Sequence, residues 1–301
     1  MPADYLGMSL SLLCAMLWAS AVILFKKSGE QKVTPLSLNT IKNLVSVALY
    51  TLTLPLLGIT FLPDISWQDW VIAGVSGVLG IGIGDAFFFS SLNRLGASLT
   101  AIVDCLYSPF MILLSVVFLS EPLSLALGLG TALVLAALIL AKGEKPKKKR
   151  DSKRLLAGFA YGVTGLLALT SSVVMVKPLL TKTSVFWVLW WRMLWGFLAL
   201  AVWMGLHPQR KKLVARLKPD ASWKTVLPGV ILGGYFATIA WLFGMRYTNV
   251  SVASVLNQLS TLFILLLAAI FLKEKLQRRH ILAAFLGFAG ACVLFLRHLV
   301  S

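Results

Sequence analysis

Four ionisable residues lie inside long apolar stretches of this sequence, where a charged side chain is costly. They are Lys42, Asp85, Asp104 and Arg192. An unpaired charge inside a membrane costs several kcal/mol, so residues of this kind generally mark ion pairs, proton relays or ligand sites. Two carboxylates and two bases could form internal salt bridges, take up a proton, or bind a charged group of a ligand.

The composition of the chain indicates an integral membrane protein. Of its 301 residues, 58% are hydrophobic and only 13% are charged, against about 25% charged residues in a typical soluble domain. The mean hydropathy is +0.87. The net charge of +17 lies mainly in short segments between apolar runs. This placement favours a topology signal over a nucleic-acid surface, and no nucleic-acid partner is expected.

Ten apolar runs approach the roughly 20 residues that a membrane-spanning helix needs. A basic segment, 142–154, separates the first five runs from the last five. We therefore expect an all-α integral membrane protein in which a first five-helix unit, 1–141, is linked by 142–154 to a second, 155–301. The expected spans are 6–25, 36–58, 70–92, 97–119, 123–141, 155–176, 185–206, 226–245, 250–272 and 281–296.

The two halves resemble each other in sequence. A shift of 153 positions superimposes Ser98 on Ser251, Phe110 on Phe263, and Glu121 on Glu274. Shifts of 151 and 150 superimpose Lys26 on Lys177 and Lys42 on Arg192. Five crossings are an odd number, so the second copy must be inserted upside down. The sequence thus predicts ten transmembrane helices as two inverted five-helix repeats, with a binding site near the midplane between them.

Basic residues alternate between the two sides of this predicted topology. The loops on one side hold 22 Lys and Arg residues, and the loops and termini on the other side hold 4. Because positive loops stay in the cytoplasm, we expect a multi-pass plasma membrane protein with basic loops inside and both termini outside. The basic segments 142–154 and 207–224 should also attract anionic membrane lipid.

Several short motifs resemble the EamA-type carriers of the drug/metabolite transporter superfamily. Residues 12–20 (LLCAMLWAS) are similar to the first-helix signature, and the residues at 108–109 (SP), 118–121 (FLSE) and 271–274 (FLKE) to the endings of the fourth and ninth helices. Lys42 and Arg192 stand where those carriers often have arginine. The resemblance covers nearly the whole chain and implies a ten-helix carrier that moves small metabolites or drugs by alternating access. In two respects the chain departs from the family: its charge predicts external termini, and Leu169 stands where the second repeat would match Trp18.

The first half places three ionisable groups at one depth. Asp85 and Asp104 lie equally far from the predicted loop between the third and fourth spans. Lys42 lies about six residues, or ~9 Å, inside its own span from the same face. Two alternatives follow: an internal salt bridge that ties the three spans together, or a carboxylate free to accept a proton, since two acids face one base.

The second half lacks matching acids. The same shift pairs Asp85 with Thr238 and Asp104 with Asn257, so Arg192 could bind a carboxylate or phosphate of a substrate or snorkel to the outer headgroups. Aromatic side chains could line the cavity or belt the membrane interface. We expect substrate contacts from Arg192, Trp18, Tyr107, Trp187, Tyr235 and Trp241, together with the polar pair Asn257 and Gln258.

These patterns favour a secondary active transporter, an exporter or exchanger of small metabolites such as amino acids. The alternative is a non-transporting intramembrane binding or assembly protein. An enzyme is not expected, because the spans hold no nucleophile–histidine pair and no metal-ligand cluster. The three cysteines lack metal-ligand spacing, and no metal or cofactor is expected. The run of glycines at 80–84 lacks the Walker lysine, which argues against a phosphate loop and favours close helix packing. Glu121 and Glu274 lie at helix ends, where they would cap or orient the loops.

Overall fold

The computed structural model describes residues 2–29, 35–141, 152–206, 223–271 and 278–296. Throughout these ranges the regular secondary structure is helical, and they contain no strand. The basic segment 142–154 falls almost entirely outside the described residues, as do most of the 207–224 segment and Glu274. The all-α fold class predicted from the sequence is confirmed.

The helices follow the two halves of the sequence. The first half contains α1 (Pro2–Gly29), α2 (Pro35–Leu56), α3 (Trp67–Gly77), the π-helix η1 (Val78–Gly84), α4 (Asp85–Asp104), α5 (Tyr107–Leu119) and α6 (Leu125–Ala141). The second half contains α7 (Ser152–Val176), α8 (Leu179–Lys182), α9 (Val185–Leu206), α11 (Trp223–Val230), the π-helix η2 (Ile231–Phe236), α12 (Ala237–Tyr247), α13 (Val250–Gln258), α14 (Ser260–Phe271) and α15 (Arg278–Phe295).

Seven helical segments in the described ranges are long and apolar enough to cross a membrane, and α5 and α6 are shorter apolar helices. Helix α2 has the length of a span, but its N-terminal half carries Lys42 and several amide and hydroxyl side chains. The number of ten crossings therefore stays a prediction. One predicted loop differs: the backbone at 93–96 is helical within α4, and the helix breaks only at 105–106. Within this segment, the guanidinium carbon of Arg94 lies 4.4 Å from the centre of the Tyr161 ring.

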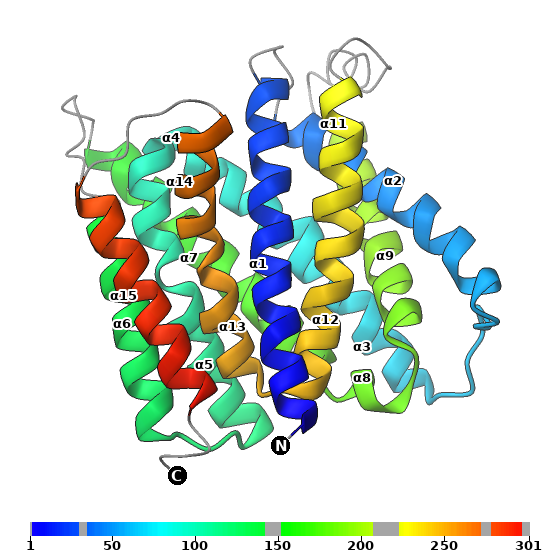
Figure 1. The fold of residues 1–301 in the computed structure, drawn as a ribbon. Helices are drawn as coiled ribbons and strands as arrows, with labels where there is room; N and C mark the ends of the chain where they lie inside the picture. Colours follow the sequence, from blue (N-terminus) through cyan, green and yellow to red (C-terminus); the bar gives the residue numbers. More distant parts are fainter. Residues whose placement is uncertain (1, 30–34, 142–151, 207–222, 272–277, 297–301) are drawn as a thin grey trace.

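The two halves are interleaved rather than side by side. Helix α1 of the first half packs against α11, α12, α13 and α14 of the second half (Figure 1). Its counterpart α7 packs against α3, η1, α4 and α5 of the first half. Helix α1 begins, and α15 ends, on the same side of the bundle (Figure 1). There the rings of Tyr5 and Phe295 stack with their centres 6.4 Å apart. Each half thus supplies one helix to the core of the other.

Irregular helical segments recur at the repeat distance of 153 residues. The π-helices begin at Val78 and Ile231, and the following helices break before Tyr107 and before Ser260. A π-helical turn is rare and concentrates at functional sites. Exposed backbone groups are tolerated at membrane depth only where protein or a water-filled cavity covers them. The irregularities therefore point to one region between the halves.

Glycine in η1 allows the two halves to approach closely at this region. A Cβ atom on Gly80 would lie 2.3 Å from the Ser172 hydroxyl, and one on Gly84 would lie 3.3 Å from the carbonyl oxygen of Gly165. Helix α7 therefore packs directly on the backbone of η1. The close packing predicted for the glycine run is confirmed.

Candidate functional site

A central cavity of about 320 Å³ lies between the two halves. Its walls come from α1, α2, η1, α4, α5, α7, α9, η2, α12, α13 and α14. Both π-helices and both helix breaks contribute residues. Discontinuous helices at an interface between repeats are the usual construction of a transporter binding site, and this volume suits a small molecule.

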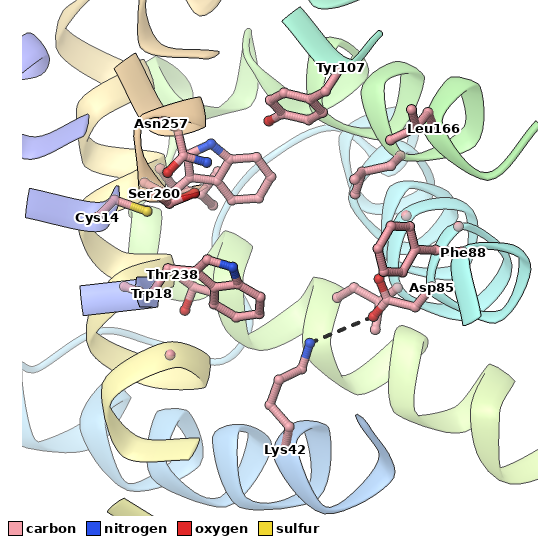
Figure 2. Close-up of a pocket in the computed structure, with 18 of the residues that line it drawn as sticks. Cys14, Trp18, Lys42, Asp85, Phe88, Tyr107, Leu166, Thr238, Asn257 and Ser260 are labelled. Carbon is pink, nitrogen blue, oxygen red and sulfur yellow. Dashed lines mark ion pairs between the residues drawn. The ribbon is translucent and has the colours of Figure 1, made fainter. Parts of the chain in front are cut away.

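One wall of the cavity carries an ion pair. The Lys42 ammonium nitrogen lies 3.6 Å from Oδ2 of Asp85, with the side chains 17% and 25% exposed (Figure 2). The same nitrogen lies 5.9 Å from the centre of the Trp18 ring, within range of a cation–π contact. Asp104 lines the same cavity. The structure thus joins the lysine of α2 to one of the two predicted acids.

Arg192 lies on α9 and is 4% exposed, yet its side chain lines the cavity. Its Nη1 donates to the carbonyl oxygen of Ser172 at 3.1 Å, and its Nη2 donates to the Ser172 hydroxyl at 3.4 Å. Both acceptors are neutral. A guanidinium carries five N–H donors, so part of the fork remains for a ligand. The side chain points inward, which is incompatible with snorkelling to the headgroups.

The helix breaks carry a second polar group of residues. Gln258 accepts a hydrogen bond from the Ser108 hydroxyl at 2.6 Å and donates to the carbonyl oxygen of Asp104 at 2.8 Å. Its amide therefore joins α13 to α4 and α5, although it also lines the cavity. By contrast, three polar atoms of other lining residues are buried without a hydrogen-bond partner. They are the Tyr107 hydroxyl, Nε1 of Trp241 and Oδ1 of Asn257.

Two aromatic residues expected in the cavity do not line it. Trp187 is fully buried, and its Nε1 donates to the carbonyl oxygen of Phe61 at 3.0 Å. The Tyr235 hydroxyl lies 2.6 Å from that of Thr53 on α2. Trp187 instead packs α9 against Phe61 and against Trp70 of α3, whereas Tyr235 packs η2 against α2. Their sequence signal was only aromatic character within a predicted span, which does not fix the direction of a side chain.

Several lining residues were not predicted from the sequence. Thr238 and Ser260 occupy the repeat positions of Asp85 and Tyr107, so the duplication itself could have identified them. Apolar residues such as Leu166 and Phe88 carry no signal that separates a cavity wall from a packed core. Within the described ranges, no cluster of three or more His, Cys, Asp or Glu residues is placed to bind a metal ion.

Glu121 connects the two halves at the C-terminal end of α5. Its carboxylate accepts hydrogen bonds from the backbone N–H of Val250 at 2.6 Å, and from the backbone N–H of Ser251 at 3.0 Å. The hydroxyl of Ser251 also donates to it. These are the free donors at the N-terminus of α13, where a carboxylate is favoured by the helix dipole. The capping role expected for Glu121 is confirmed.

The fold and the cavity define a membrane protein of the carrier class, built from two repeats around a central site. Comparison with known proteins then gives the family. Residues 5–142 and 156–296 each match the EamA-like transporter family, so the chain belongs to that family. It is a membrane transporter rather than an enzyme, and the two matches agree with the inverted-repeat architecture.

Two relatives illustrate this assignment. The S-adenosylmethionine uptake transporter of Rickettsia felis (strain ATCC VR-1525 / URRWXCal2) is 26% identical over 146 residues, which cover 48% of this chain and 47% of the relative. The match thus spans about half the length of that transporter. A protein of known crystal structure superimposes with a TM-score of 0.80 at 18% identity, covering 98% of this chain and 99% of the other. This second likeness shows the fold alone.

Proposed function

We propose that this protein is a secondary active transporter that moves amino acids or related small metabolites by alternating access, as an exporter or exchanger. The observation that carries the proposal is the inward-facing Arg192, whose acceptors are both atoms of the neutral Ser172. A buried guanidinium is stabilised by a carboxylate, and the two form a bidentate pair. A substrate carboxylate entering the cavity would supply that group.

The opposite charge is available in the same cavity. The carboxylate of Asp85 is paired with Lys42 at 3.6 Å, and Asp104 also lines the wall. A substrate ammonium group could take the place of Lys42 beside Asp85, or a proton could neutralise the carboxylate as the substrate leaves. Either event changes the charge of the cavity and couples occupancy to the conformation of α2 and α4.

The named substrate of the Rickettsia felis relative supports this substrate class. That protein is called an S-adenosylmethionine uptake transporter, and S-adenosylmethionine is an amino-acid derivative. Both the carboxylate and the amino group of such a compound would find an opposite charge in the cavity described above. Because the matched region is half of that transporter, the likeness supports the substrate class and leaves the direction of transport to experiment.

We also propose the plasma membrane as the location, with the basic segments in the cytoplasm and both termini outside. The contact between Tyr5 and Phe295 supports a common side for the two ends of the chain. The excess of basic residues in the loops predicted for the opposite side, 22 against 4, supports the assignment of the cytoplasmic side.

The test is amino-acid binding to purified protein with Arg192 changed. Arg192→Lys should weaken binding while the fold is retained, because a point charge cannot make a bidentate pair. Arg192→Gln should reduce binding of zwitterionic and anionic amino acids at least about 100-fold, as expected for the loss of roughly 3 kcal/mol of charged hydrogen bonding.

The matched control is Arg246→Gln, which removes a positive charge at the end of α12, over Tyr247 and outside the cavity lining. It should leave binding unchanged. Unchanged affinity in a stable Arg192→Gln protein would overturn the proposal. A protein that binds amino acids but does not move them across a membrane would instead be the non-transporting binding protein.

A further inference from the structure

One end of the cavity holds three polar atoms that lie close together but make no hydrogen bond of normal geometry. The Tyr107 hydroxyl, Nε1 of Trp241 and Oδ1 of Asn257 are all buried without a hydrogen bond. Tyr107 is only 7% exposed. Each buried polar atom left unpaired costs about 1–3 kcal/mol, and buried polar groups are normally paired by protein or ordered water. Three in one place indicate a position for a ligand group.

These atoms meet where both halves of the chain interrupt their helices. Tyr107 is the first residue of α5, Asn257 lies at the end of α13, and Trp241 lies on α12. In Figure 2 the Tyr107 hydroxyl points across the cavity towards Asn257. The side chains of Asn257 and Trp241 are close polar neighbours of this hydroxyl, but neither makes a hydrogen bond of good geometry to it.

The backbone around the three atoms is fixed by Gln258, whose amide oxygen and amide nitrogen both form hydrogen bonds. Gln258, next to Asn257, accepts from Ser108, next to Tyr107, and donates to the backbone of Asp104. This bridge joins the two helix breaks. The neighbouring side chains therefore project from positions that the protein holds before any ligand arrives, and preorganised groups of this kind give specificity.

The chemistry of the three atoms limits what can satisfy them together. The indole N–H of Trp241 can only donate, the amide oxygen of Asn257 can only accept, and the Tyr107 hydroxyl can do either. A ligand group that bridges Trp241 and Asn257 must therefore both accept and donate hydrogen bonds. An ammonium group has no acceptor, and a carboxylate has no donor. A hydroxyl or a primary amide has both.

We propose that Tyr107, Trp241 and Asn257 form a subsite for an uncharged hydroxyl or primary amide on the transported molecule. The inference rests on the proposed function, because the same molecule would place its carboxylate at Arg192. It narrows the substrate class to polar, uncharged-side-chain amino acids and their derivatives. Sites that hydrogen-bond a substrate group strongly reject the analogue that lacks it, since their own polar atoms are then left unpaired.

The experiment compares amino acids of nearly equal shape in competition binding to the purified full chain. L-threonine is matched with L-valine, and L-asparagine with L-leucine. The wild-type protein should bind the polar member of at least one pair about tenfold or more tightly than its apolar partner. Trp241→Phe, Asn257→Leu and Tyr107→Phe should each reduce that ratio, because each removes the polar atom of the proposed subsite and retains most of the side-chain volume.

The control variant is Trp187→Phe. Trp187 is fully buried, and its Nε1 donates to the carbonyl oxygen of Phe61 at 3.0 Å. Trp187 is outside the cavity lining. This variant loses a buried indole N–H and some stability but should keep the wild-type ratio. It therefore separates a loss of recognition from a general loss of fold.

Two negative results have different meanings. If the matched amino acids bind equally well and the three cavity variants do not change their ratio, then water or the three side chains themselves satisfy these atoms and the subsite is refuted, while Arg192 still anchors the substrate. If no amino acid binds to the stable wild-type protein, both the proposed function and the subsite fail.

Discussion

The ion pair between Lys42 and Asp85 provides a quantitative test of how the cavity is built. The perturbation is a double-mutant cycle of Lys42→Gln, Asp85→Asn and the two changes together. Each single replacement leaves one charge without its partner in a largely buried position. The double replacement removes both charges, so it should cost less than the sum of the two single changes.

The expected magnitude follows from the geometry. At a separation of 3.6 Å and an effective dielectric constant of about 20, the Coulomb attraction is about 4–5 kcal/mol. Desolvation of the two charges opposes this gain, and removing one member of a buried pair typically costs about 3–5 kcal/mol. Because both side chains keep some exposure, we expect about 3 kcal/mol for each single change and a coupling energy of about 2 kcal/mol.

The assay is unfolding of the purified protein in mixed micelles, followed by tryptophan fluorescence. The chain supplies its own control pair, Lys182 and Asp69, whose atoms are 3.0 Å apart but whose lysine is 54% exposed. An exposed pair of this kind should give a coupling energy below about 1 kcal/mol. Additive effects at Lys42 and Asp85, or equal coupling in the two pairs, would refute the reasoning.

Three further predictions concern packing, capping and orientation. Gly77→Ala should destabilise the fold by about 1–3 kcal/mol, because the new Cβ would lie 2.3 Å from the carbonyl oxygen of Arg192. Gly128→Ala should be nearly neutral, because the space around Gly128 is open. Equal melting temperatures of the two variants would contradict this prediction. Glu121→Gln should cost about 2 kcal/mol, because an amide cannot accept all the bonds from the N-terminus of α13, and an unchanged unfolding transition would show that the cap is dispensable. A reporter fused after Ser301 should be active only as an external fusion, and cytoplasmic activity would reverse the predicted topology.

The fold class could be predicted because it depends on properties that accumulate over many residues. Hydropathy alone identifies a membrane protein, and the odd number of apolar runs in each duplicated half implies inversion. The loop expected between the third and fourth spans was wrong, because residues 93–96 are helical within α4. Arg94 lies there over the ring of Tyr161, a contact between distant segments that no local pattern indicates.

The site was predictable where a residue was chemically out of place. Lys42, Asp85 and Arg192 carry charge in apolar surroundings, and the structure brings all three to one cavity. Side-chain direction was not predictable in the same way. Trp187 donates to the loop carbonyl of Phe61, Tyr235 bonds to Thr53 of α2, and Gln258 bridges two helix breaks. These contacts were not predictable because each partner lies more than 100 residues away in the sequence.

The most direct test of the central claim is counterflow in liposomes that contain the purified protein. The probe is the radiolabelled amino acid that binds most tightly in the competition experiment. Liposomes preloaded with the same unlabelled amino acid should take up the label faster than empty ones, because a single central site exposed alternately to the two sides exchanges one molecule for another. The Arg192→Gln protein should lose this acceleration. Binding of the amino acid without any counterflow in the wild-type protein would contradict the account.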